Sequence, residues 1–193
     1  SAGRLGLLDD SAPRNLADLG WNTPESVDVL WALSRSPDAD LALRTLVRLR
    51  SAVGDEWSEI DGLVRTERAF RGRLFAVIGS SDALADHLVA EPSSWRLLLA
   101  DELPDRAEVD RLMLASVGAE PVPGEVEKGN QVYRSALTGP KAVIALRLAY
   151  RNLILQLAAH DVASTVEDEP VMWLPEVGAY LSDCADAALQ AAG

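Results

Sequence analysis

Hydrophobic residues recur three and four positions apart along most of the chain, which is the spacing of one face of an α-helix. Several helix starts are marked by a capping side chain followed by proline, as at Thr23–Glu25 and Ser36–Asp38. No stretch of four or more residues alternates in the way that a half-buried strand would. The pattern therefore predicts an all-α fold, a multi-helix array of short paired helices that ends in two longer helices.

The first of the two longer helices is predicted to begin at Thr138–Pro140 and to run to about Ala163. Its apolar residues surround most of the circumference, which is typical of a helix that is buried on several sides. We expect its leucines to lie in the core, in particular Leu146, Leu153 and Leu157.

The final helix has a clearer two-sided pattern. Its buried face is predicted to consist of five residues at helical spacing: Leu174, Val177, Leu181, Ala185 and Ala188. The opposite face carries polar residues and is expected to be solvated: Glu176, Asp183, Asp186 and Gln190.

One segment interrupts the helical pattern. Residues 119–130 read AEPVPGEVEKGN, with two prolines, two glycines and no apolar period, which is typical of a loop or linker. The chain is accordingly predicted to consist of a short-helix part (1–118), a loop (119–139) and a long helical hairpin (140–193).

The composition excludes several classes of protein. A formal net charge of −12 would repel nucleic acid phosphates and an anionic membrane surface alike. The single cysteine, Cys184, excludes an internal disulfide framework and makes a cytoplasmic location the default. No signal-peptide organisation is visible, and no window is expected to reach the ~18 apolar residues of a membrane span.

The bulky anchors of the core are expected to come from the tryptophans, because other aromatic residues are few. They are Trp21, Trp31, Trp57, Trp95 and Trp173. With 48% hydrophobic residues, the chain is long and apolar enough to build a sizeable core.

One local basic patch stands out in this acidic chain, and it consists of Arg65, Arg68, Arg71 and Arg73. Guanidinium groups at this spacing can receive a nucleotide phosphate or the acidic surface of a partner. The alternative is a solvated helix face whose arginines pair with neighbouring carboxylates such as Asp61 and Glu67.

No catalytic, cofactor-binding or metal-binding residue can be assigned from the sequence. Gly79–Asp82 contains Gly-Ser and an aspartate, but Leu84 stands where a second carboxylate would be needed, and we interpret the stretch as a C-cap glycine followed by a serine N-cap. Asp38 and Asp40 are assigned to the first turn of a helix, where acidic residues favour the helix dipole.

The remaining polar candidates are weak for other reasons. Glu167–Asp168–Glu169 is interpreted as a solvated acidic turn, with a weak cation site as the alternative. His87 and His160 lie far apart and have no cysteine beside them, which argues against a zinc site. Cys184 has no histidine in its helix and is predicted to be a small buried apolar residue.

Three stretches resemble a known family in order and spacing. They are Arg4–Leu7 with Asn15–Gly20, then Leu74–Leu88 continuing to Pro92, and finally Leu146–Arg151, Leu157–Asp161 and Tyr180–Leu189. Together they resemble the N-terminal region of the bifunctional glutamine synthetase adenylyltransferase/adenylyl-removing enzyme in its actinobacterial form. The sequence departs from the family pattern at Asn152–Leu153, at His160 and at Cys184.

The resemblance implies a larger parent enzyme with two nucleotidyltransferase domains joined by helical regions. One domain transfers AMP from ATP to a tyrosine of glutamine synthetase, and the other removes AMP by phosphorolysis. Each holds magnesium through Gly-Ser-Asp-x-Asp on a strand. Glutamine and a PII-type signalling protein regulate the balance.

That catalytic strand is not in the sequence. The resemblance therefore implies a helical segment that supports the adenylyl-removing domain and helps to dock partners, with no catalysis of its own. The alternative is a free-standing helical interaction module that uses the surface around Arg65–Arg73.

Overall fold

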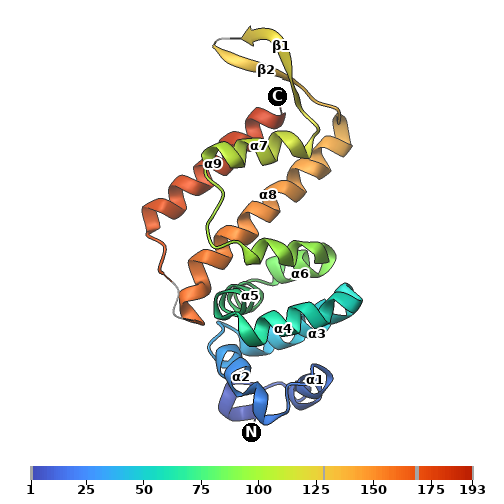
Figure 1. Ribbon diagram of the computed structural model, residues 1–193, viewed down its shortest axis with the longest axis vertical. Coiled ribbons are helices and arrows are strands. Elements are labelled where there is room, and N and C mark those ends of the chain that lie inside the picture. Colours follow the sequence, from blue (N-terminus) through green and yellow to red (C-terminus); the bar gives the residue numbers. More distant parts are fainter. Residues whose placement is uncertain (1, 128, 168–169, 193) are drawn as a thin grey trace. The chain divides into compact units, whose positions relative to one another are not determined.

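The computed structural model describes residues 2–127, 129–167 and 170–192, and it is predominantly helical, with nine α-helices and one small two-stranded sheet in this part of the chain (Figure 1). The predicted helical fold is thereby confirmed. The chain divides into two compact units. The first comprises residues 1–101 and 158–172, and the second comprises residues 102–157 and 173–193.

The first unit is built from short helices. Its α-helices are α1 (Ala12–Asp18), α2 (Val27–Ser34), α3 (Ala39–Val53), α4 (Trp57–Thr66), α5 (Arg68–Ser80) and α6 (Asp82–Ala90). Its 3-10 helices are η1 (Ala2–Leu5), η2 (Pro24–Ser26), η3 (Gly54–Glu56), η4 (Pro92–Leu99) and η5 (Ala163–Thr165). Helix α5 is central, because residues 70–79 are all buried and the helix packs against α2, α3, α4, α6, η4 and η5.

Aromatic rings fill much of this core. Trp21 lies between Trp57 and Phe75, with ring centroids 6.3 and 6.0 Å apart, and Trp95 meets Phe70 edge-on at 5.9 Å. Offset and edge-to-face pairs of this kind are favoured by the ring quadrupoles.

Two of the five tryptophans are not core anchors, and for them the prediction was wrong. Trp31 and Trp173 are exposed. Helix α2 turns Val29, Ala32 and Leu33 inward instead, so Trp31 is left on its outer face.

The predicted N-cap is confirmed for Ser81 of α6. Helix α3 begins at Ala39 with Asp38 as its N-cap, so the start predicted at Ser36 and the assignment of Asp38 to the first turn were wrong. Asp38 accepts a hydrogen bond from the backbone N–H of Leu41 at 2.8 Å, and Ser81 accepts one from Leu84 at 3.3 Å. The C-cap assignment of Gly79 was wrong, because α5 continues through it to Ser80. A Cβ at Gly79 would lie 3.0 Å from Cβ of Ser36 and 3.1 Å from the carbonyl oxygen of Asp38, so this glycine permits a close approach of α5 to the turn between α2 and α3.

Two glycines inside helices give a matched pair of expected results. Gly62→Ala in α4 meets no atom within 4 Å and should stabilise the protein by about 0.5–1 kcal/mol through helix propensity. Gly79→Ala gains the same propensity but crowds Ser36 and Asp38, and it should destabilise by about 1–3 kcal/mol. Urea unfolding of both variants checks this, and a stabilising Gly79→Ala would contradict the packing.

The second unit contains α7 (Arg106–Ser116), the strands β1 (Glu120–Glu127) and β2 (Asn130–Arg134), residues 139–157 of α8 (Gly139–Val162), and α9 (Leu174–Ala192). The segment predicted as a loop is therefore an antiparallel hairpin, with Glu120 opposite Arg134 and Glu127 opposite Asn130. Its register is irregular between Pro121 and Val126. Because most of its side chains are exposed, the hairpin lacks the apolar alternation that reveals a strand.

The buried face of α9 is not the predicted one. Tyr180, Cys184 and Ala187 are buried, whereas Leu174 is 81% exposed and Leu181 is 39% exposed. Helix α9 packs against α7, and this contact selects its inward face.

Two aspartates of α9 that we predicted to be solvated, Asp183 and Asp186, lie beside the α7–α9 contact and pair with an arginine of α7. Arg106 of α7 donates to Asp183 at 2.6 Å and lies 3.6 Å from Asp186. Both carboxylates therefore pair across the helix contact.

Helix α8 has the predicted bounds, but only part of it is buried as predicted. Leu153 and Leu157 are buried, whereas Leu146 is half-buried and Ile144 is 67% exposed. The first turns therefore leave an apolar surface open.

Helix α8 together with η5 also corrects an expectation about membrane spans. Within the described residues, Gly139–Thr165 is long and apolar enough to cross a membrane by length and composition. The same test is passed by core helices of soluble proteins. Arg147 and Arg151 in its interior would be costly at the centre of a bilayer.

Candidate functional site

The four arginines predicted as a partner contact lie in α4 and α5, and each has a different environment. Arg65 donates from Nε to Asp61 at 2.9 Å and from Nη1 to the hydroxyl of Ser26 at 3.1 Å. Asp61 also accepts a hydrogen bond from the indole of Trp21 at 2.6 Å. The predicted pairing of Arg65 with Asp61 is confirmed, and it ties α4 to the buried tryptophan.

Arg71 forms a buried ion pair with a residue far away in the sequence. Its Nε donates to Glu167 Oε1 at 2.7 Å and its Nη1 to the carbonyl oxygen of Val64 at 3.0 Å. Both charged side chains are almost completely buried, so each depends on the other for its solvation. Arg68 donates to the other oxygen of Glu167 at 3.2 Å, with its own side chain 68% exposed.

The path of the backbone makes room for this pair. Gly72 follows Arg71, and a Cβ on Gly72 would lie 3.0 Å from Cβ of Glu167. Glu167, which we predicted in a solvated turn, is instead buried against α5. Asp168 and Glu169 of the same predicted turn lie outside the described residues.

Arg73 points toward the end of η4. It donates from Nη1 to the carbonyl oxygens of Leu98 and Ala100, at 3.1 and 2.6 Å, and from Nη2 to Asp101 at 3.0 Å. His160 lies beside the same segment, with Nε2 3.1 Å from the carbonyl oxygen of Ala100. Arg73 thus satisfies backbone acceptors at the end of a helix.

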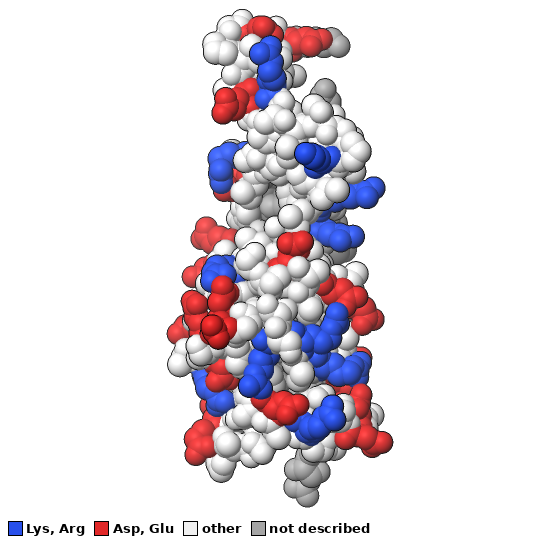
Figure 2. All heavy atoms as spheres, turned by 90° about the vertical axis from the view of Figure 1, so that its right-hand side faces the viewer, with Lys and Arg blue, Asp and Glu red and all other residues white. Residues whose placement is uncertain are grey.

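The four arginines therefore do not share one surface. Arg71 and Arg73 are buried, and a partner could reach only Arg65 and Arg68. On the face drawn in Figure 2, acidic and basic side chains are interspersed and no single basic patch is visible. The sequence could not reveal this, because the partners of Arg71 and Arg73 are distant along the chain.

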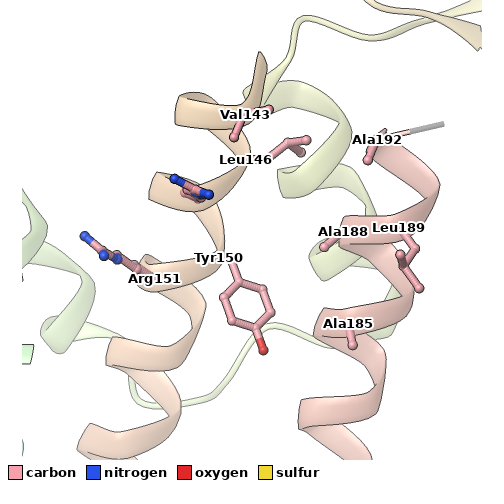
Figure 3. Close-up of a pocket in the computed structure, with 9 residues that line it drawn as sticks. Val143, Leu146, Tyr150, Arg151, Ala185, Ala188, Leu189 and Ala192 are labelled. Carbon is pink, nitrogen blue, oxygen red and sulfur yellow. The ribbon is translucent and has the colours of Figure 1, made fainter. Parts of the chain in front are cut away.

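The second unit contains a groove that sequence reasoning missed. It lies between α8 and α9 and has a volume of about 720 Å³ (Figure 3). Its lining is mostly apolar and includes Val143, Leu146, Tyr150, Ala185, Ala188 and Leu189. The ring of Tyr150 points into the space between the two helices. The sequence hinted at it only through the apolar residues that surround most of the circumference of α8, more than one neighbouring helix can cover.

Tyr180 and Cys184 lie on the buried face of α9, and both have ionisable side chains. Burial raises the pKa of the Cys184 thiol to about 11, and the nearby Asp183 carboxylate adds to the effect. Burial likewise raises the pKa of Tyr180. Since the thiolate is the nucleophilic form, Cys184 is poorly reactive at neutral pH, in agreement with its prediction as a buried apolar residue.

Similar proteins are known from actinobacteria. The chain is 54% identical over 190 residues to the bifunctional glutamine synthetase adenylyltransferase/adenylyl-removing enzyme of Nocardia farcinica. It is 51% identical over 193 residues to the enzyme of that name from Mycolicibacterium smegmatis, and 47% identical over 197 residues to that from Mycobacterium tuberculosis. These alignments cover 98–100% of the chain. No protein-family model and no solved structure matches the chain.

The chain belongs to the glutamine synthetase adenylyltransferase/adenylyl-removing enzyme family. It spans only 18–19% of the length of these relatives and is a fragment of such an enzyme. The resemblance stated from the sequence is confirmed.

Gly79–Asp82 differs in structure from the magnesium-binding motif of the adenylyltransferase family. The resemblance assigns magnesium binding to Gly-Ser-Asp-x-Asp on a strand, whereas Gly79–Asp82 lies at the junction of α5 and α6. The carboxylate of Asp82 stands in the first turn of a helix, where it favours the helix dipole. Among the described residues, no group of three or more His, Cys, Asp or Glu side chains is placed to hold a metal ion.

Proposed function

We propose that this chain is a helical support segment of an enzyme that adenylylates and deadenylylates a tyrosine of glutamine synthetase, and so controls nitrogen assimilation. The observation that carries the proposal is the identity of 45–54% across the whole chain with enzymes of that name. The complete enzyme would use ATP and magnesium, act in the cytoplasm, and bind glutamine synthetase and a PII-type protein. Chemistry is carried by the nucleotidyltransferase domains outside these residues.

The support role is argued from the packing. Helices that hold a neighbouring domain must themselves be rigid, and α5 meets that need, because it is buried along most of its length. In the second unit, α9 is fixed to α7 by the buried Tyr180, Cys184 and Ala187. Arg65 and Arg68 are the members of the arginine set that a protein partner could contact.

A substitution in the complete enzyme tests the support role. Ala187→Asp places an unpaired carboxylate in the α7–α9 contact, where Ala187 is 1% exposed, and should lower AMP removal more than AMP addition. The same change at the exposed Ala179 of this helix is the matched control and should leave both activities unchanged. Both rates are measured with purified glutamine synthetase as substrate.

The two rates of the Ala187→Asp enzyme distinguish a loss of support from global unfolding. Equal loss of both activities in the Ala187→Asp enzyme would indicate global unfolding, and no loss of either would contradict the support role.

The isolated chain, incubated with glutamine synthetase, ATP and magnesium, or with the adenylylated synthetase and phosphate, should show no turnover. Turnover that a substitution in this chain abolishes would contradict its assignment as a non-catalytic segment.

A further inference from the structure

The groove between α8 and α9 has the lining expected of a helix-binding groove. Alanines at 185, 188 and 192 form the α9 side, and their small side chains let another backbone approach closely. Val143, Leu146 and Tyr150 form the α8 side (Figure 3). A helix that lays its apolar face into such a groove contacts it through side chains three and four positions apart.

The apolar lining of the groove is exposed. Two of its apolar lining residues are largely open to solvent, since Leu189 is 73% exposed and Val143 is 45% exposed. Contiguous exposed apolar patches on soluble proteins mark interaction sites. This surface therefore needs a covering partner.

The charges beside the groove select that partner. Arg147 and Arg151 line it on the α8 side, both are exposed, and no ion pair joins either of them to another described residue. Their spacing of four places them on one face of the helix. In a chain of net charge −12, two arginines beside an apolar groove that form no ion pair within the described residues favour an apolar segment with acidic flanks.

The relatives indicate where such a segment is found. They are about five times longer than this chain, so most of the surface that could cover α8 and α9 in the complete enzyme belongs to residues outside 1–193. We propose that an apolar helix with acidic flanks, from that remaining part of the enzyme, docks in the groove between α8 and α9. This inference rests on the proposed function in one respect, that the chain works within the longer enzyme.

Thiol labelling tests the proposal without using activity. Cys184 is first replaced by alanine, other cysteines of the complete enzyme are likewise removed, and Leu189→Cys is introduced. A maleimide should react with this cysteine about tenfold or more slowly in the complete enzyme than in the 193-residue chain, because docking closes the site. Ala179→Cys, exposed on the same helix and away from the groove lining, should react equally fast in both.

A second pair of variants tests the role of charge. Arg147→Glu combined with Arg151→Glu in the complete enzyme should restore most of the labelling of Leu189→Cys, since the acidic flanks are then repelled. Arg14→Glu, an exposed position in the first unit, should not. Unchanged protection in the double variant would overturn the acidic-flank part of the proposal.

Three results would overturn the docking proposal itself. They are equal labelling of Leu189→Cys in the complete enzyme and the isolated chain, protection of the isolated chain that rises with its concentration, and protection by phosphatidylglycerol vesicles alone. The second result would assign the groove to another copy of the chain, and the third would assign it to a membrane. Loss of AMP removal in Ala187→Asp without protection of the groove would retain the support role and reject only this site.

Discussion

Glu167→Ala is expected to lower the free energy of unfolding by about 3–5 kcal/mol, the usual cost of leaving one member of a buried ion pair without its partner. In the native protein, Arg71 donates to Glu167 at 2.7 Å, and both side chains are almost fully buried. The alanine variant leaves the guanidinium in the core with the carbonyl oxygen of Val64 as its acceptor. Urea unfolding followed by tryptophan fluorescence measures the effect.

Two comparisons isolate the cause. Arg68→Ala removes the exposed arginine that also contacts Glu167 and should cost about 0–1 kcal/mol. Replacing the buried pair together, as Arg71→Met with Glu167→Leu, should cost less than Glu167→Ala alone, because no charge is then left buried. A Glu167→Ala variant as stable as Arg68→Ala would show that the pair is solvated.

Leu153→Ala is expected to cost about 2–5 kcal/mol, the range for truncating a leucine in a packed core. Leu153 is 1% exposed in the half of α8 that is buried. Ile144→Ala, on the exposed half of the same helix, should change stability by less than about 0.5 kcal/mol. Thermal unfolding followed by circular dichroism measures both losses of stability. A loss for Leu153→Ala as small as that for Ile144→Ala would mean that α8 is peripheral along its whole length.

The local chemistry of helix ends was predictable from the sequence. Ser81 occupies the N-cap position predicted for it, and its hydrogen bond is local. Asp38 caps α3 by the same local chemistry, two residues after the cap predicted at Ser36. The start of α8 at Gly139 followed in the same way from a proline at the beginning of an apolar run. Such signals involve only a few neighbouring residues, so they can be recognised without knowledge of the tertiary structure.

The facing of the last helix was not predictable. Helix α9 has alanines on several sides, so its apolar pattern fits more than one phase, and Leu181 and Leu174 favoured the wrong one. The packing of α7 and the ion pair of Arg106 with Asp183 decide between the phases. Both come from a helix far earlier in the chain, with Arg106 77 residues before Asp183, and no local pattern encodes them.

The arginine set failed as a surface prediction for a related reason. Spacing alone indicated that Arg65, Arg68 and Arg71 share a face, but spacing does not say which face is covered. The cover for Arg71 is Glu167, 96 residues away.

The two-part composition of the first unit has a consequence for its biosynthesis. Residues 1–101 leave the ribosome well before residues 158–172, so Arg71 emerges without the carboxylate that neutralises it. At about 5–20 residues per second, the 56 residues between the two segments (102–157) take about 3–11 s to make. Throughout that interval the nascent first unit stays incomplete, and this gap lengthens its exposure to chaperones and proteases.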